Sequence, residues 1–151
     1  MNDQKLKRKI IVIDVPKYHQ AMRAVFEDAL AYFAGFEDFD LIVIDANHTN
    51  LANGNLLYKI QQEINPKRFV HIIYIQGWHY INGVKLLSYL RTNSLIKTIP
   101  IVISSADDNI EDFMNKQSVF FVSVPICLYE WGQTINRAFK LAILASKAQH
   151  N

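Results

Sequence analysis

Residues 72–106 read IIYIQGWHYINGVKLLSYLRTNSLIKTIPIVISSA, and this stretch decides the fold. Two short apolar runs, 72–75 and 99–103, flank a segment in which apolar residues recur at every third or fourth position, as on the buried side of a helix. A strand, a helix and a strand in this order form a βαβ unit, whose two strands are parallel. Both strands are continuous apolar runs rather than alternating ones, which is typical of a sheet covered on both faces.

The rest of the chain repeats this alternation of apolar strands and amphipathic helices. Strand patterns cover residues 9–15, 40–45, 69–75, 99–104 and 119–124, and helical patterns cover residues 16–34, 56–64, 83–95, 110–116 and 128–147. Five strands that alternate with five helices predict an α/β fold, namely a flavodoxin-like (βα)5 doubly wound parallel sheet with strand order 2-1-3-4-5. In such a sheet, ligands gather beyond the carboxyl ends of the strands, so the strand ends hold the candidate site.

Composition excludes several classes of protein. Half of the 151 residues are hydrophobic and a fifth are charged, which is typical of a folded domain, and the net charge of +2 does not indicate a nucleic-acid partner. Cys127 is the only cysteine, which excludes an internal disulfide and a multi-cysteine zinc site, and we expect its side chain to be buried. No apolar run is long enough for a membrane span or a signal peptide, so we expect a cytoplasmic protein without a membrane contact.

The ends of the predicted strands resemble those of receiver domains, the phosphate-accepting modules of bacterial response regulators. Residues 99–106, IPIVISSA, resemble the family's fourth strand, with Ser105 at its Thr/Ser position. Residues 122–125, VSVP, resemble the end of the fifth strand, with Pro125 at the family's proline. Asp14 matches one member of the acidic pair that follows the first strand. The resemblance implies a single receiver-like domain over residues 1–151.

The departures from the family decide the predicted chemistry. A receiver uses carboxylates to hold Mg²⁺ and an aspartate to accept phosphate, because phosphoryl transfer requires charge to be neutralised. The second acid, the phosphoacceptor and the lysine of the family correspond here to Val15, to Ile75 or Gln76, and to Val124. Asp14 and Ser105 cannot make a phosphorylation site by themselves. We therefore expect a phosphorylation-independent pseudo-receiver with no catalytic residue, no cofactor and at most a weak Mg²⁺ site at Asp14.

Two alternatives remain open. In a shifted register, residues 40–54 resemble the family's third strand and its following turn, with Asp45 as the phosphoacceptor of an authentic receiver. This register retains an aspartate, but it leaves a strand and a helix missing between Asp14 and Asp45. In the other alternative, Asp14 and Asp45 end adjacent strands and share a cation in a metal-dependent or small-molecule-binding enzyme.

The last predicted helix has a broader apolar surface than the stripe of about 100° that a helix needs to lie on a sheet. Receivers commonly dimerise through the face made by the fourth helix, fifth strand and fifth helix, which correspond to residues 110–116, 119–124 and 128–147. The resemblance therefore implies a homodimer or another protein partner at this face, and no direct contact with nucleic acid. The residues that we assign to a switch or to this interface are Phe121, Trp131, Ile135 and Phe139.

The loop after the third strand, QGWHY at residues 76–80, leaves one further question open. Its aromatic side chains could fill the space that phosphate and Mg²⁺ occupy in a receiver. They could equally form a recognition surface, because aromatic residues dominate binding hot spots.

Overall fold

The computed structural model describes residues 6–14, 19–33, 38–45, 54–76, 83–105, 119–123 and 127–149. Within these ranges strands and helices alternate along the chain. The elements are β1 (Lys7–Asp14), α1 (His19–Leu30), β2 (Phe39–Asp45), α3 (Asn55–Gln62), β3 (Phe69–Ile75), α4 (Gly83–Thr92), β4 (Ile101–Ser105), β5 (Val119–Ser123) and α6 (Leu128–Gln149). The helix expected at residues 110–116 and the loop residues 77–80 lie outside the described ranges.

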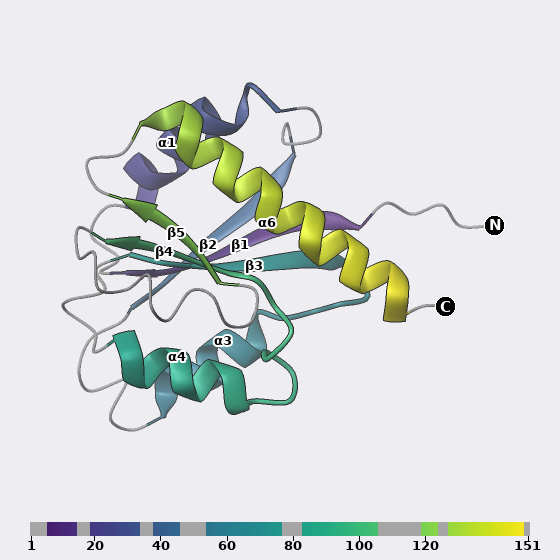
Figure 1. Ribbon diagram of the computed structural model, residues 1–151. Coiled ribbons are helices and arrows are strands. Elements are labelled where there is room, and N and C mark those ends of the chain that lie inside the picture. The colour runs from purple at the N-terminus through teal and green to yellow at the C-terminus, as the bar shows by residue number, and fades with distance from the viewer. Residues whose placement is uncertain are drawn as a thin grey trace.

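The five strands form one parallel sheet in the order β2-β1-β3-β4-β5. Helices α1 and α6 cover one face of this sheet, and α3 and α4 cover the other (Figure 1). The predicted flavodoxin-like, doubly wound fold and its strand order are therefore confirmed. Residues 40–45 belong to β2, which is the second strand along the chain and lies at an edge of the sheet. The shifted register, in which Asp45 ends the third strand, is wrong because the third strand is β3.

Each face of the sheet carries its own core cluster, because successive side chains of a strand point to opposite faces. The α3/α4 cluster consists of Ile, Leu and Val side chains, for example Ile11, Ile13 and Ile73, each 0% exposed. The α1/α6 cluster also contains the aromatic residues Phe26, Phe39, Tyr74, Trp131 and Phe139. The central strand β3 is buried at every position, as expected for a continuous apolar run.

Most of the wide apolar surface of helix α6 is buried within the chain. It contacts α1 as well as β3, β4 and β5, so two sides of the helix are buried. The residues assigned from the sequence to a partner interface are consequently core residues: Trp131 is 3%, Ile135 0% and Phe139 1% exposed. That assignment is wrong for these three, and the side chain of Phe121 is outside the description. No helix among the described residues is long and apolar enough to cross a membrane.

Other apolar positions of this region are exposed. Leu144 on α6 is 64% exposed, so part of the wide apolar surface does face outward as the sequence predicted. Cys127, which precedes α6, is also exposed. The expectation of a buried cysteine is wrong, because the first buried position in α6 is Trp131 and the residues before it, 127–130, are all exposed.

Candidate functional site

The carboxyl edge of the sheet brings together three of the candidate site residues. Asp14 ends β1 and lies directly opposite Asp45, which ends β2, in the register of the two strands. Gln76 follows β3, and its backbone N–H donates to the carbonyl oxygen of Ile13 at 3.0 Å. Ser105 ends β4, one strand further along the sheet. Val124 and Pro125 lie outside the described residues.

The alternation of side chains along the strands places Asp14, Asp45 and Gln76 on the side of the sheet that α1 and α6 cover. Two positions earlier in each strand, the side chain packs in or against the α1/α6 cluster; these residues are Val12, Val43 and Tyr74. Asp14, Asp45 and Gln76 are each half-buried. The polar residues at the carboxyl edge thus lie on the same face of the sheet as the aromatic residues of the α1/α6 cluster.

A hydrogen-bonded aromatic cluster lies directly beneath this edge. The indole Nε1–H of Trp131 on α6 donates to the hydroxyl oxygen of Tyr74 on β3 at 2.9 Å. The ring of Phe26 on α1 lies 5.4 Å from the Tyr74 ring in an edge-on arrangement and 4.3 Å from the Trp131 ring. These three side chains are at most 3% exposed. Because a buried indole or phenol needs a polar partner, the hydrogen bond is what allows both groups to lie in the core.

The hydroxyl group of Tyr74 is the ionisable group of this cluster. Burial raises the pKa of Tyr74 to about 12, and the negative charge of Asp14 adds to the rise. Hydrogen bonding with Ser104 on β4 and with Trp131 acts in the opposite direction. The phenol therefore stays neutral at physiological pH, and its environment contains groups from β1, β4 and α6.

Among the described residues, the edge carries two carboxylates, those of Asp14 and Asp45, and one amide, that of Gln76. Mg²⁺ requires near-octahedral oxygen coordination that includes carboxylates and the phosphoryl group. The described ranges contain no group of three or more His, Cys, Asp or Glu side chains that could hold a metal ion. Of the strand ends, only β1 and β2 contribute a carboxylate, and the position that follows β3 is an amide, Gln76.

The aromatic cluster was missed from the sequence, which placed Trp131 in a partner interface. One signal was available in the sequence of β3, FVHIIYI. Apart from a histidine, Tyr74 is the only residue of this strand with a polar side-chain group. A tyrosine in a strand that is covered on both faces needs a hydrogen-bond partner from a neighbouring element. The spacing of α6 does not show that Trp131 supplies it.

Comparison with known proteins identifies the fold. No family model matches the chain, and no curated protein matches it. Among solved structures, the chain is similar to a response regulator in red light signaling of R. palustris, with a TM-score of 0.54 and 12% sequence identity. The match covers 86% of this chain and 90% of that chain. At this identity the similarity shows the fold alone, so the chain shares its α/β fold with a response regulator.

Proposed function

We propose that the chain is a receiver-like signalling module that acts through protein contact and does not accept a phosphoryl group. The fold shared with a response regulator supports the signalling role. The absence of phosphorylation is inferred from the residues at the carboxyl end of β3, the strand that lies between β1 and β4 in the sheet. Ile75 ends this strand and Gln76 follows it, and neither an alkyl group nor an amide can form an acyl phosphate.

Treatment of the full chain with acetyl phosphate and Mg²⁺, followed by intact-mass spectrometry, tests this proposal. We expect an unchanged mass under conditions in which a phosphate-accepting receiver gains one phosphoryl group. A stoichiometric gain of one phosphoryl group would contradict the proposal. The Asp45→Asn variant then locates the acceptor, because loss of the added mass in this variant would assign phosphorylation to Asp45.

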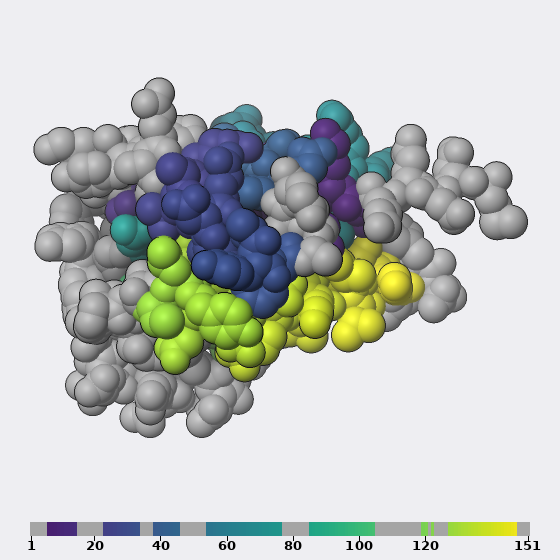
Figure 2. All heavy atoms as spheres, turned by 90° about the horizontal axis from the view of Figure 1, so that it is seen from above, coloured from purple at the N-terminus to yellow at the C-terminus, as the bar shows by residue number. Residues whose placement is uncertain are grey.

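The contact surface that we propose consists of aromatic residues at the start of α6 and directly after α1. Tyr129 is 54% exposed and Tyr32 71% exposed, and their ring centroids lie 6.1 Å apart. Phe33 stacks on Tyr129 at 5.9 Å. Figure 2 shows the first turns of α6, in green, beside the blue surface of the α1 region. Exposed aromatic side chains are enriched in binding hot spots, and this cluster replaces the buried residues that the sequence suggested.

The simplest partner is a second copy of the chain, which contacts the surface formed by Tyr32, Phe33 and Tyr129. Sedimentation over a range of concentrations tests this, and we expect self-association that Tyr129→Ser weakens. Tyr58→Ser is the matched control, because Tyr58 is 59% exposed on α3, on the opposite face of the sheet. A strict monomer at every concentration would contradict the dimer.

One observation favours a second candidate function, a cation site shared by two strands. The register pairs the backbones of Asp14 and Asp45, and a cation bridging their side chains would offset the repulsion of two neighbouring carboxylates. Titration with Mg²⁺ or Mn²⁺, followed by tryptophan fluorescence, tests it. A saturable change that Asp14→Asn removes would support the shared cation, and a flat titration would contradict it.

A further inference from the structure

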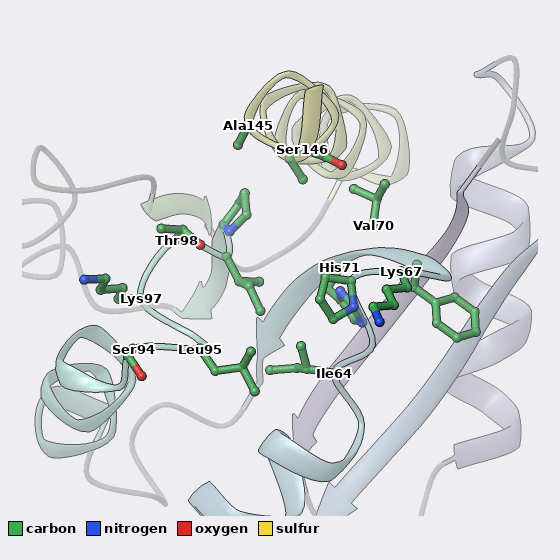
Figure 3. Close-up of a pocket in the computed structure, with 15 residues that line it drawn as sticks. Ile64, Lys67, Val70, His71, Ser94, Leu95, Lys97, Thr98, Ala145 and Ser146 are labelled. Atoms are coloured by element: carbon green, nitrogen blue, oxygen red, sulfur yellow. The ribbon is translucent and has the colours of Figure 1, made fainter. Parts of the chain in front are cut away.

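A hollow opens at the amino ends of β3 and β4, at the opposite edge of the sheet from Asp14 and Gln76. Its volume is about 540 Å³, which lies within the range of small-molecule sites. Three parts of the chain form its walls, as Figure 3 shows: the turn between α3 and β3, the turn between α4 and β4, and the last turns of α6. The residues that line the hollow include neither those of the carboxyl edge nor the exposed aromatic residues at the start of α6.

The first wall is held in place by His71, which is 5% exposed. Its Nε2 accepts the backbone N–H of Asn65 at 3.0 Å, and the side-chain oxygen of Asn65 in turn accepts the N–H of Lys67 at 3.2 Å. Burial, together with the positive charge of Lys9, lowers the pKa of His71 to about 4, so the imidazole is neutral near pH 7 and keeps this acceptor. The turn is therefore shaped by contacts within the chain.

The second wall is held in place in the same manner. The side-chain oxygen of Asn93 accepts the backbone N–H groups of Leu95 at 3.0 Å and Ile96 at 3.2 Å. The Nη1 group of Arg91 donates to the carbonyl oxygens of Lys97 at 2.8 Å and Ile99 at 3.1 Å. Both walls thus keep their shape through side-chain to backbone hydrogen bonds, and a hollow between two fixed turns is preformed, as ligand sites usually are.

The lining indicates the chemistry of a ligand. It is mostly apolar, and Figure 3 shows Ile64 and Leu95 on facing walls. The charged groups among the described lining residues are Lys67 and Lys97, and none of these residues is acidic. Glu63, which precedes Ile64, already pairs with Lys9 at 3.1 Å. Apolar walls with cationic groups at the rim fit a ligand that is apolar in its body and negatively charged at one end.

We propose that this hollow binds a small amphipathic organic anion, a carboxylate attached to a short hydrocarbon or aromatic group. The apolar part lies between Ile64, Leu95 and the end of α6, and the carboxylate lies at Lys67. In Figure 3 the Lys67 side chain lies beside His71, whereas Lys97 marks the other side of the hollow. The proposal goes beyond the proposed function and does not depend on it, because neither a protein partner nor a phosphoryl group is involved.

Calorimetric titration of the full chain with 4-phenylbutanoate tests the proposal, with 4-phenylbutanol as the uncharged analogue. We expect one saturable site and about fivefold tighter binding of the carboxylate, as an ion pair with an exposed lysine gives. Chemical-shift changes in a ¹H–¹⁵N NMR spectrum should centre on residues 65–71 and 94–99. Absence of saturable carboxylate binding, or shift changes elsewhere on the chain, would overturn the proposal.

Variants separate the apolar part of the site from the charged part. Ala145→Leu adds bulk at the α6 wall and should weaken both ligands, whereas Lys140→Leu, at an exposed α6 position outside the lining, should change neither. Lys67→Gln should weaken only the carboxylate, and Lys59→Gln, on the exposed side of α3, is its control. Unchanged carboxylate binding in Ala145→Leu would refute the location. If the unsubstituted chain bound 4-phenylbutanoate and 4-phenylbutanol with equal affinity, the proposal that the ligand is an anion would be refuted.

Discussion

The two faces of the sheet are built from the same strands, but they keep their polar groups in different places. On the α3/α4 side, the described core is entirely aliphatic, and the polar contacts lie at the end of α3, where Lys9 meets Glu63 and His71 meets Asn65. On the α1/α6 side, a hydrogen bond between Tyr74 and Trp131 lies within the core itself. The chain therefore has one face with polar contacts at its margin and one with a polar contact in its interior.

This difference indicates which of the two helical layers is sensitive to a change at the carboxyl edge of the sheet. Aliphatic cores tolerate rearrangement of side chains when volume is conserved, whereas a satisfied buried polar network specifies one arrangement. Asp14 lies on the same side of β1 as Val12, which belongs to the α1/α6 cluster, so the carboxyl edge adjoins this cluster and not the aliphatic one. We therefore expect the proposed protein contact to use the α1/α6 face, and acid sensitivity to arise on the α3/α4 face.

The largest effect is expected where α6 crosses α1. A Cβ atom on Gly132 would lie 2.4 Å from the carbonyl oxygen of Ala29 and 2.9 Å from the Phe33 ring. Alanine in place of glycine normally stabilises a helix by about 0.5–1 kcal/mol, but here the backbone of α1 must move. We expect Gly132→Ala to lower the free energy of unfolding by about 3 kcal/mol, measured by urea denaturation.

Gln133→Ala is the control for that experiment, because Gln133 is the next residue of α6 and is exposed. Its free energy of unfolding should stay within about 0.5 kcal/mol of the parent. If Gly132→Ala were as stable as the parent chain, the close approach of α1 and α6 would not exist in solution. The α1/α6 face would then be no more tightly specified than the opposite one.

The next effect concerns the margin of the α3/α4 face and depends on pH. The pKa of His71 is lowered from 6.5 to about 4, mainly by burial, so the unfolded chain binds a proton that the folded chain does not. The stabilisation is present above pH 6.5 and is lost as the pH falls towards 4. Between pH 7.5 and 4.5 we expect a loss of about 2–3 kcal/mol in the free energy of unfolding.

His71→Gln isolates this contribution, because glutamine keeps an acceptor oxygen and does not titrate. The variant should be less stable than the parent at pH 7.5 and should lose less stability on acidification. Identical pH dependence of parent and variant would show that His71 does not hold the turn at Asn65 as a neutral acceptor. The pH dependence would then have to come from other groups.

The fold could be predicted from the sequence because its signals are local. The strands of the centre are uninterrupted runs such as FVHIIYI, and their alternation with helices permits few topologies. The placement of Asp14, Asp45 and Gln76 at one edge follows directly, since the carboxyl ends of parallel strands meet there. The boundaries were less exact: β1 begins at Lys7 rather than residue 9, and α4 ends at Thr92 rather than residue 95.

The features that could not be predicted depend on contacts between distant residues. A wide apolar stripe on α6 is compatible with an exposed interface or with a second buried contact, and only the position of α1 decides between them. The hollow at the amino edge depends on how Asn65 and Asn93 shape two turns, with His71 and Arg91 reaching them from elsewhere. Residue types alone do not encode such pairings.

The smallest effect in this series measures the buried hydrogen bond that distinguishes the α1/α6 face. Tyr74→Phe removes the acceptor of the Trp131 indole N–H, which would be left unsatisfied in the core. We expect a loss of about 1–2 kcal/mol in the free energy of unfolding, measured by urea denaturation. Trp131→Phe and the double variant complete a double-mutant cycle, whose coupling free energy should be about 1 kcal/mol.

Tyr58→Phe is the matched control, because the same hydroxyl group is removed from a side chain that is 59% exposed on α3, and it should be nearly neutral. A coupling free energy near zero would mean that the Tyr74–Trp131 hydrogen bond contributes nothing beyond packing. The two faces would then be energetically alike, and the inference that the α1/α6 face relays changes from the carboxyl edge would lose its support. The same cycle can be measured in the Asp14→Asn variant. A smaller coupling free energy between Tyr74 and Trp131 in that variant would show that Asp14 at the carboxyl edge influences the aromatic cluster.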